Sequence, residues 1–312
     1  MTRWEQATVL FGTQAMSRLF NRNYELIVTA SNGEILIYRP PMEMKFSITN
    51  YPNNTLAISQ ISIYGISARA RDVIQIRGEN GKGYGKVTLK AGYGDDLGVI
   101  FDGRINSVQV AKDGVSTYIS LFCSNITSSW DNASFQAWGE GTPYIEVLRD
   151  LAANFGLPVE VVGDFSDLPR LPVGCNGGGQ LCRDLLNSLK QHFRFDWMIT
   201  PSKTILSRHG IAREGISYEL SSMNGMAGVP RWYTDSMEVD IKLNYRIQPL
   251  DIVNILSDFW TLNFSGAYFT DLNDLAHMQL KTGKFNVLKT RHEGALSGDI
   301  WNTTVICQWR GK

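Results

Sequence analysis

From about residue 23 onward, apolar and polar residues alternate along the chain with a period of two. The pattern is clearest in "YELIVTA", "GEILIYR", "EMKFSITN", "AISQISIYGI", "VIQIRGE", "KVTLKAGY" and "VSTYISLFC". These runs are short, rich in β-branched and aromatic residues, and separated by Gly, Asn or Asp. Such a pattern is typical of antiparallel β-strands joined by tight turns. The sequence therefore predicts an all-β unit in the first part of the chain.

The period changes near residue 129, where two helices are predicted. In "TPYIEVLRDLAANFG", Thr142 is the expected N-cap, Pro143 the first helical residue and Gly156 the stop signal. The second helix lies in "QLCRDLLNSLKQHFRF", and its expected apolar stripe consists of Leu181, Leu185, Leu186, Leu189 and Phe193. The strands "FDWMIT" and "TILSRHG" follow. This segment is predicted to be a small α/β module.

The β pattern resumes at about residue 210 in "MEVDIKLNY", "PLDIVNILS", "GKFNVLKTRHEG" and "DIWNTTVICQW". The predicted fold class is therefore mainly β, with two antiparallel β regions separated by a small helical α/β insert. We expect the chain to divide into an N-terminal arm (1–22), a first β domain (23–128), the α/β insert (129–209) and a second β domain (210–312).

One segment near the end of the first β region is echoed near the end of the second. "GRINSVQVAKDG" through "YISLFC" (103–123) and "GKFNVLKTRHEG" through the Cys of "TTVICQW" (283–307) share one order of features: glycine, basic residue, apolar residue, Asn, strand, turn, strand and Cys. A duplicated β domain interrupted by an insert would produce this repeat.

Composition excludes several classes of function. The 312-residue chain carries 30 Lys and Arg against 30 Asp and Glu, and a net charge of zero argues against a protein that grips a polyanion. No stretch approaches the roughly 20 apolar residues that span a bilayer, and the N-terminus lacks the apolar core of a secretory signal. We therefore expect no membrane insertion and assembly in a cytoplasm-like compartment.

The segment "VTLKAGYGDDLGVIFDGRINSV" raises the possibility of acidic chemistry. If Asp95, Asp96 and Asp102 converged, they could hold a divalent cation or share acid/base work. However, adjacent strand residues point to opposite faces, and cation loops place ligands at alternate positions. "GYGDD" also supplies the residues that a tight turn needs. We predict a metal-free turn at 95–96 and a bulge or second bend at Asp102 and Gly103.

The remaining candidate motifs do not form a site. "RGENGKGYGKV" is glycine-rich, but its spacing does not match a phosphate loop, and a hairpin loop between two strands is expected. The histidines are scattered: they are His192, His209, His277 and His292. The cysteines have neither zinc-ligand nor disulfide spacing: they are Cys123, Cys175, Cys182 and Cys307. No catalytic, cofactor-binding or metal site is therefore predicted.

Cys123 and Cys307 lie in apolar β runs, so we expect both thiols to be buried. Hidden carboxylate pairs of the glycosidase type need not be close in sequence. A peptidoglycan-cleaving enzyme therefore stays open as an alternative.

The order of segments resembles the baseplate hub proteins of tailed bacteriophages, also called phage late control or tail hub proteins. The opening "MKFSITN", "NTLAISQISIYGISARARDVI" and "VTLKAGYGDDLGVIFDGRINSV" are similar to that family's first barrel. "YIEVLRDLAANFGLPV" and "LLNSLKQHFRFDWMI" resemble its helical insert. "SSMNGMAGVPRW", "YRIQPLDIVNILS" and "GKFNVLKTRHEGALSGDIWNTTVIC" resemble its closing region. The resemblance covers almost the whole chain.

The resemblance implies a non-enzymatic virion protein with two tube-like β-barrel domains. Three chains would then form a ring of six similar domains that adapts a six-fold tail tube to a three-fold spike. The implied partners are two further copies, the tail tube or its terminator, the central spike and other baseplate proteins. DNA would cross the ring without specific binding. A distal tail protein of a non-contractile phage, or the hub of a related contractile injection machine, would share the barrels and is the main alternative.

Overall fold

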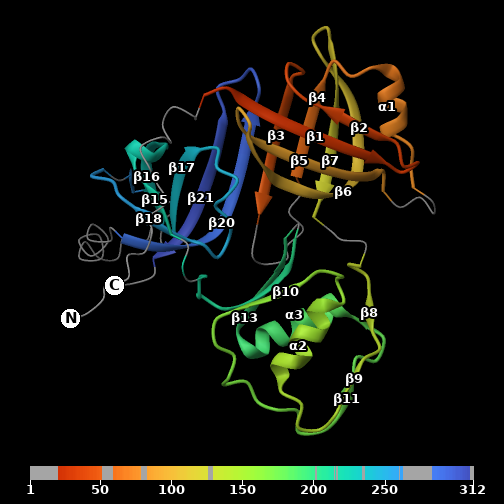
Figure 1. Cartoon of the computed structure of the whole chain (residues 1–312), viewed down its shortest axis with the longest axis vertical. Helices are drawn as coiled ribbons and strands as arrows, with labels where there is room; N and C mark the ends of the chain where they lie inside the picture. Colours follow the sequence, from red (N-terminus) through yellow and green to blue (C-terminus); the bar gives the residue numbers. More distant parts are fainter. Residues whose placement is uncertain are drawn as a thin grey trace.

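The computed structural model describes residues 20–50, 59–78, 83–125, 129–200, 202–213, 215, 217–233, 236–259, 261–262 and 283–309. Figure 1 shows two β regions side by side and a smaller helical part below them. The predicted fold class, mainly β with an α/β insert, is confirmed. Most of the predicted N-terminal arm and His277 lie outside the described residues. The division into these four segments stays a prediction. No helix in the described ranges is long and apolar enough to cross a membrane.

The first β region is a rolled antiparallel sheet with the strand order β2-β1-β5-β6-β7-β4-β3. Alternate residues of these strands, such as Leu26, Val28 and Leu89, fill one buried core. Partly buried residues, such as Met42, pack against this core. The elements are β1 (Arg22–Ala30), β2 (Ile35–Tyr38), β3 (Met44–Asn50), β4 (Ser59–Tyr64), α1 (Ala68–Ile74), β5 (Gly85–Tyr93), β6 (Asp96–Asp113) and β7 (Ser116–Ser124).

Helix α1 corrects one prediction, because "VIQIRGE" was expected to be a strand. Its first residues instead complete a helix that begins after Ser67, whose side-chain oxygen accepts a hydrogen bond from the Ala70 backbone N–H at 3.2 Å. The run Ala-Arg-Ala-Arg favours a helix, and the N-cap fixes its start. The glycine-rich loop therefore follows a helix and precedes β5. Its residues 79–82 lie outside the described part.

The α/β insert packs two helices against a three-stranded sheet with the order β10-β14-β13. Both predicted helices are present. The first begins one residue late: Pro143 is its N-cap, and the Thr142 hydroxyl donates to the Gly139 carbonyl at 2.8 Å. The elements are β8 (Ala133–Ser134), β9 (Ala137–Trp138), α2 (Tyr144–Ala153), β10 (Val159–Val162), β11 (Cys175–Asn176), β12 (Gln180–Leu181), α3 (Cys182–Phe193), β13 (Phe195–Ile199) and β14 (Thr204–Arg208).

The second β region has the strand order β19-β16-β17-β21-β20-β18-β15 and its own buried core. Two of its pairings, β15 with β18 and β16 with β19, are parallel, which the alternation pattern alone did not predict. The elements are β15 (Ser217–Leu220), the 3-10 helix η3 (Ser222–Asn224), β16 (Met226–Trp232), β17 (Met237–Lys242), β18 (Ile252–Ile255), β19 (Thr261–Leu262), β20 (Gly283–Ala295) and β21 (Trp301–Trp309).

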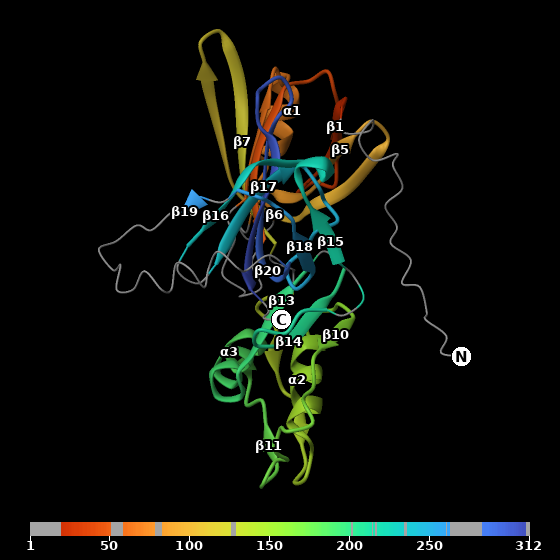
Figure 2. The same cartoon turned by 90° about the vertical axis from the view of Figure 1, so that its left-hand side faces the viewer.

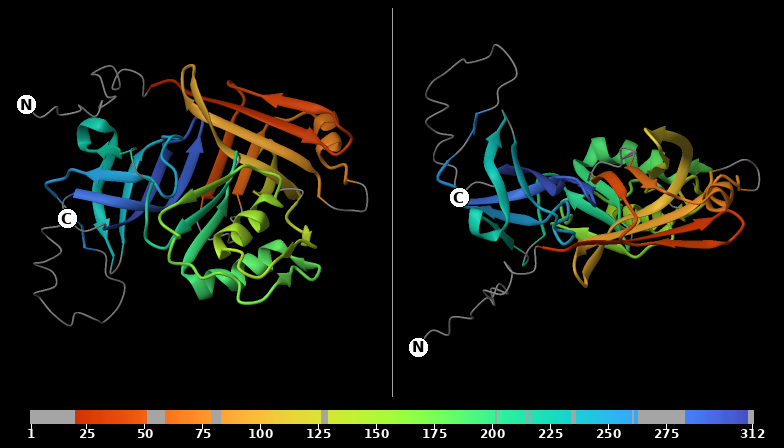
Figure 3. Two further views of the ribbon diagram at one scale, coloured as in Figure 1. Left: turned by 60° about the horizontal axis from the view of Figure 1, so that its bottom comes forward. Right: turned by 90° about the horizontal axis from the view of Figure 1, so that it is seen from above.

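The two β regions form one continuous 14-stranded sheet, because β3 of the first pairs with β20 of the second. Residues Lys45 to Asn50 lie opposite Ala295 to Thr290. Figure 3 shows this continuity from above. Trp301 of the second region also inserts into the first core, where its ring meets Phe46 edge-on at 5.2 Å between centroids. The sheet therefore holds the two regions in a fixed relation.

Candidate functional site

Each β region contains the same arrangement of four antiparallel strands. In the first, the hairpin β3–β4 pairs through β4 with β7 of the hairpin β6–β7. In the second, the hairpin β16–β17 pairs through β17 with β21 of the hairpin β20–β21. The spatial orders β3-β4-β7-β6 and β16-β17-β21-β20 are therefore equivalent. The outer neighbours β5 and β18 are also alike, since each pairs antiparallel with the start of the long strand.

The strand register repeats as well, with a buried cysteine as its reference point. Cys123 of β7 lies opposite Ser59, the first residue of β4. Cys307 of β21 lies opposite Met237, the first residue of β17. Both cysteines are fully buried, as predicted, and burial raises the pKa of each thiol well above its usual value. The two cysteines thus occupy equivalent positions in the two regions.

Each long hairpin carries a β-bulge immediately after the residue opposite its cysteine. Asn106 is the extra residue in β6, following Ile105, and Leu288 is the extra residue in β20, following Val287. This register corrects the sequence echo in detail. The glycines at 103 and 283 are not equivalent: Ile105 follows the first by two positions, whereas Val287 follows the second by four. The bulges show that the hairpins match structurally.

We call the four-strand arrangements β3-β4-β7-β6 and β16-β17-β21-β20 the first and second quartet. Their eight strands share one polar face and one apolar face. Residues directly opposite each other in a sheet point to the same side, so the register identifies both faces. The apolar face covers the two cores. The polar face includes Gln109, Ser120, Ser62, Lys45, Arg291, Thr304 and Asp240, all from the phase of each strand that points away from the cores. Phe122, Tyr118 and Ile306 lie in the same phase, so the face is mostly rather than entirely polar. It is a candidate lining for a wet passage.

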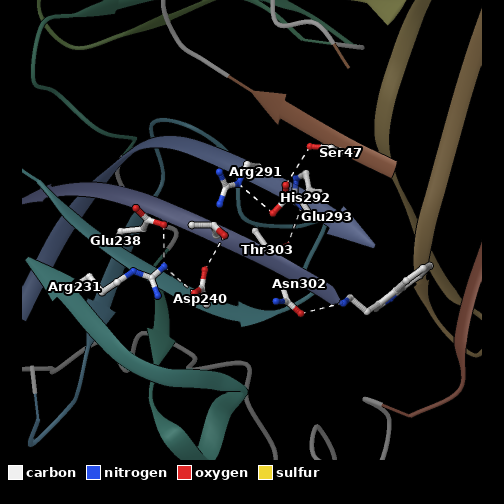
Figure 4. Close-up of polar contacts among 11 residues, drawn as sticks. Ser47, Arg231, Glu238, Asp240, Arg291, His292, Glu293, Asn302 and Thr303 are labelled. Atoms are coloured by element: carbon white, nitrogen blue, oxygen red, sulfur yellow. Dashed lines mark hydrogen bonds and ion pairs between the residues drawn. The ribbon is translucent and has the colours of Figure 1, made fainter. Parts of the chain in front are cut away.

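Ion pairs neutralise part of the charge on this face in the second region (Figure 4). The Arg231 guanidinium lies 2.8 Å from Glu238 and 2.7 Å from Asp240. Burial opposes its charged form, but the hydrogen bonds that the guanidinium donates to both carboxylates prevail and raise the pKa of Arg231. Asp240 also accepts a hydrogen bond from the Thr304 hydroxyl at 2.7 Å. Arg231 of β16 is therefore held by two carboxylates of the neighbouring strand β17.

A second polar group spans the junction of the two β regions. The Arg291 Nε atom lies 3.3 Å from Glu293 on the same strand, and the Ser47 hydroxyl of β3 donates to Glu293 at 3.2 Å. Figure 4 shows these side chains crossing from β20 to β3. The sequence held a usable signal for these residues, since the charged residues of "MEVDIK" and "KTRHE" fall in the polar phase of each strand. Their partners could not be inferred from that phase.

His292 lies on the opposite, apolar side of the same junction. It is 2% exposed, its Nδ1 atom is 2.8 Å from the Thr303 hydroxyl, and it faces Ile48 across the β3–β20 pairing. Burial lowers the pKa of His292 to about 4. The imidazole is therefore neutral near pH 7. Among the residues that the structure describes, no three His, Cys, Asp or Glu side chains are placed to hold a metal ion.

The acidic segment that drew attention in the sequence connects the two β regions. Asp95 is exposed in the turn before β6, and Asp96 accepts hydrogen bonds from Tyr245 at 2.7 Å and from Arg246 at 2.9 and 3.0 Å. Asp102 instead accepts a hydrogen bond from Thr88 on β5. Asp96 and Asp102 therefore have separate partners, and Asp95 is exposed to solvent.

The predicted bend at Asp102 and Gly103 is wrong in position. The bulges of β6 fall at Ile100 and Asn106, on either side of this pair. Gly103 instead allows close strand contact, because a Cβ atom there would lie 2.2 Å from the Ser124 carbonyl oxygen. The glycine therefore reflects packing between β6 and β7.

A cavity opens where the two β regions and the insert meet. Its lining includes Asn50, Asn125, Thr200, Gln248 and His292. The Asp102 carboxylate, the Tyr245 phenol and apolar residues such as Phe101 also line it. Near this junction Arg213 contacts Asp251 at 3.1 Å and Glu160 of the insert at 3.3 Å. The polar groups here hold the three parts together, and we assign them no chemistry.

No protein-family model and no curated protein sequence matches the chain. Among solved structures, the fold is similar to a tail protein from Neisseria meningitidis MC58, with a TM-score of 0.58 at 11% identity over 93% of this chain and 98% of that one. It is also similar to the 43 kDa tail protein of prophage MuSo2 from Shewanella oneidensis, with a TM-score of 0.55 at 11% identity over 91% and 97% of the two chains.

A third similar structure is the E. coli c3393 protein, described as a type VI secretion component with structural similarity to the T4 bacteriophage tail proteins gp27 and gp5. Its TM-score is 0.51 at 6% identity, over 87% of this chain and 74% of that one. At these identities the likeness shows a shared fold. The chain thus has the fold of these tail and secretion proteins over nearly its full length.

Proposed function

We propose that the protein is a structural component of a phage tail and serves as the baseplate hub. In this role three copies form a ring that adapts a six-fold tail tube to a three-fold central spike. The observation that carries the proposal is the repeated four-strand arrangement with its common register. Two similar domains per chain give six similar units only when three chains assemble. The similarity to two phage-type tail proteins over more than nine-tenths of the chain supports the same role.

In this proposal the continuous polar face lines the channel that DNA crosses. A passage must not retain its cargo, and basic residues that neutralise phosphates would create salt-sensitive binding. The pairing of Arg231 and Arg291 with carboxylates supports a non-adhesive lining. The partners would be the tail tube or its terminating protein, the spike and other baseplate proteins. The protein would reside in the virion tail after assembly in the bacterial cytoplasm.

The decisive experiment is the mass of the assembled complex. The full chain is produced together with the proteins encoded beside it, and the complex is measured by native mass spectrometry and imaged by electron microscopy. Three copies in one ring between tube and spike are expected. A monomer, a dimer or six copies per ring in that complex would contradict the proposal.

A second candidate is the equivalent component of a contractile injection machine. The similarity to the type VI secretion component supports it, since that protein shares the fold over most of the chain. Neighbouring genes separate the two: tail and capsid genes indicate a phage, whereas secretion genes without a capsid indicate an injection machine. A zymogram on bacterial cell wall addresses the enzymatic alternative, for which we expect no cleared band.

A further inference from the structure

The last part of β6 has an unpaired edge, whereas the equivalent part of β20 is paired with β3. On β20, residues 283–286 pair with β18, and residues 290–295 pair on that same side with β3. On β6, residues 96–104 pair with β5 in the same way. The last backbone contact on this side is at Ile105, whose carbonyl accepts a hydrogen bond from the Tyr84 N–H at 3.1 Å. Among the described strands, residues 107–113 pair only with β7. Residues 107–113 therefore present a free edge.

The free part of β6 projects beyond the body of the molecule (Figure 2). Val110 is 37% exposed there, although it lies in the strand phase that faces the core in the rest of the quartet. The equivalent residue of β20 is His292, which β3 covers and leaves 2% exposed. An exposed strand edge with an uncovered apolar residue is a site for strand addition. Its occupant can be inferred from the repeat.

Within one chain, β20, the long strand of the second quartet, pairs with β3, the first strand of the first quartet. Since β16 is the equivalent of β3, the matching occupant for β6 is β16. The β16 strand of the same chain lies at the far end of the sheet order, so it must come from another copy. We propose that residues 107–113 of β6 pair antiparallel with β16 of a second copy of this chain. This inference rests on the proposed ring.

The register of this interface follows from the equivalent junction. Ser47 lies opposite Gln60 and Glu293, and Arg231 lies opposite Glu238, the equivalent of Gln60. Arg231 of one copy is therefore placed opposite Ala111 of the next. The register of β16 shifts between Ala227 and Arg231, so the equivalent of Lys45 is Ala227, which is placed opposite Asp113. The polar face would then continue from one chain to the next without interruption. Because the interface joins two different edges, it is head-to-tail. Repeating such an interface produces a closed ring when the rotation between copies closes.

Two features of β16 limit how it can pair. Pro230 has no N–H, which removes at most one hydrogen bond from the new ladder. The two-residue strand β19 occupies the same edge at Arg231 and Trp232. A pairing of two residues is weak compared with a ladder along β6, so β6 of the neighbouring copy takes the place of β19 on assembly. This displacement is part of the proposal.

Cysteine cross-linking tests the interface directly. Asp113→Cys and Ala227→Cys are introduced together in a Cys175→Ser background, which removes the exposed native thiol. The assembled complex is treated with a short bifunctional methanethiosulfonate linker. The control pair is Ile37→Cys with Ala227→Cys, because Ile37 is 51% exposed on β2, another edge strand. We expect about tenfold more inter-chain product from the first pair, since only its thiols share a high effective concentration.

The outcomes separate the interface from the ring. Linked dimers and trimers from the Asp113 and Ala227 pair, with little product from the control, support the interface. Three copies by mass with no excess cross-linking over the control would overturn this interface and leave the ring intact. Absence of a three-copy complex would overturn both. If the first pair fails to fold, Ala111→Cys with Arg231→Cys tests the neighbouring position of the same register, with the same two readings.

Discussion

Arg246 donates two hydrogen bonds to Asp96, at 2.9 and 3.0 Å, and thereby connects the turn before β6 with the segment that follows β17. The pair is partly exposed, with 53% and 42% of the two side chains accessible to solvent. Tyr245 adds a hydrogen bond to the same carboxylate. An acidic turn that could be taken for a cation loop is thus a contact between the two β regions.

The first prediction concerns this carboxylate. The sequence alone suggests that Asp95→Asn and Asp96→Asn are both neutral. The structure predicts instead that Asp96→Asn lowers the free energy of unfolding by up to about 1 kcal/mol, because the ion pair with Arg246 is partly screened by water. Asp95→Asn is the matched control and should stay within about 0.5 kcal/mol of wild type. Urea unfolding measures both.

A chelator provides the complementary measurement for Asp96. We expect no change in the melting temperature of the wild-type protein on adding a chelator. The Asp96→Asn deficit should shrink as salt rises, because salt screens exposed pairs. A chelator effect as large as that of the substitution would contradict the ion-pair interpretation and favour a bound cation.

The second prediction concerns Gly98, which lies against the Tyr245 ring. A Cβ atom at this position would lie 1.9 Å from Cδ2 of that ring. The ring is held by its hydrogen bond to Asp96, so Gly98→Ala should lower stability by about 1–3 kcal/mol through overpacking. Gly139→Ala is the control, because nothing lies within 4 Å of its added carbon. Thermal unfolding of both variants checks this, and equal melting temperatures would contradict it.

The third prediction is a pH dependence from His292. Its pKa is about 4 in the folded protein against 6.5 for the free side chain, so the unfolded chain binds the extra proton between these values. Stability from this group is complete above about pH 6.5 and falls as pH decreases toward 4, by at most about 1.4 kcal/mol per pH unit. The expected result is a steeper loss of stability below pH 6.5 in wild type than in His292→Gln.

Carboxylates titrate in part of the same range, so the measurement is a difference between variants. Denaturant unfolding of wild type, His292→Gln and His209→Gln is compared from pH 4.5 to 7.5. His209 is exposed in the insert and bonded to Asp196 at 2.9 Å, so its variant measures what the loss of a surface histidine does to the same curve. Identical pH slopes for wild type and His292→Gln would show that the buried imidazole does not carry the effect.

The fourth prediction concerns DNA. We expect the assembled ring to bind duplex DNA more weakly than the roughly 10⁻⁴ to 10⁻⁶ M of nonspecific binders at physiological salt. Fluorescence anisotropy across a salt series measures this. Arg104 and Lys284 are exposed on the strands that open the two long hairpins, so they are the first candidates for a DNA track if tight binding is found. Micromolar affinity with a steep salt slope would contradict a passive conduit.

A charge variant makes the DNA measurement sharper. Glu238→Gln with Asp240→Asn removes the carboxylates around Arg231. The affinity for DNA should rise, and the salt slope should steepen by the equivalent of about one phosphate contact per chain. Glu140→Gln with Glu146→Gln makes the same charge change in the insert, where both residues are exposed. If the two double variants respond alike, the effect comes from net charge alone, and the polar face is not where DNA passes.

The sequence by itself determined which segments are strands and which side of each faces a core. In "MEVDIK" the alternation correctly separates Met237 and Val239, which are buried, from Glu238 and Asp240, which face the polar side. The helices of the insert were also predictable, because a period near 3.6 and a local stop signal act over a few residues. Helix α1 was missed because its seven residues are too few to show that period.

Only the tertiary structure decided which strands pair and in what register. Ser47 and Glu293 form a hydrogen bond although they are 246 positions apart in the chain, and the sequence of neither strand identifies the other as its partner. The same holds for Arg246 and Asp96, and for the bulges that align the two long hairpins. Alternation fixes the face on which a side chain lies, whereas pairing depends on how the whole sheet covers its cores. The free edge of β6 is therefore visible only once the pairing of β20 with β3 is known.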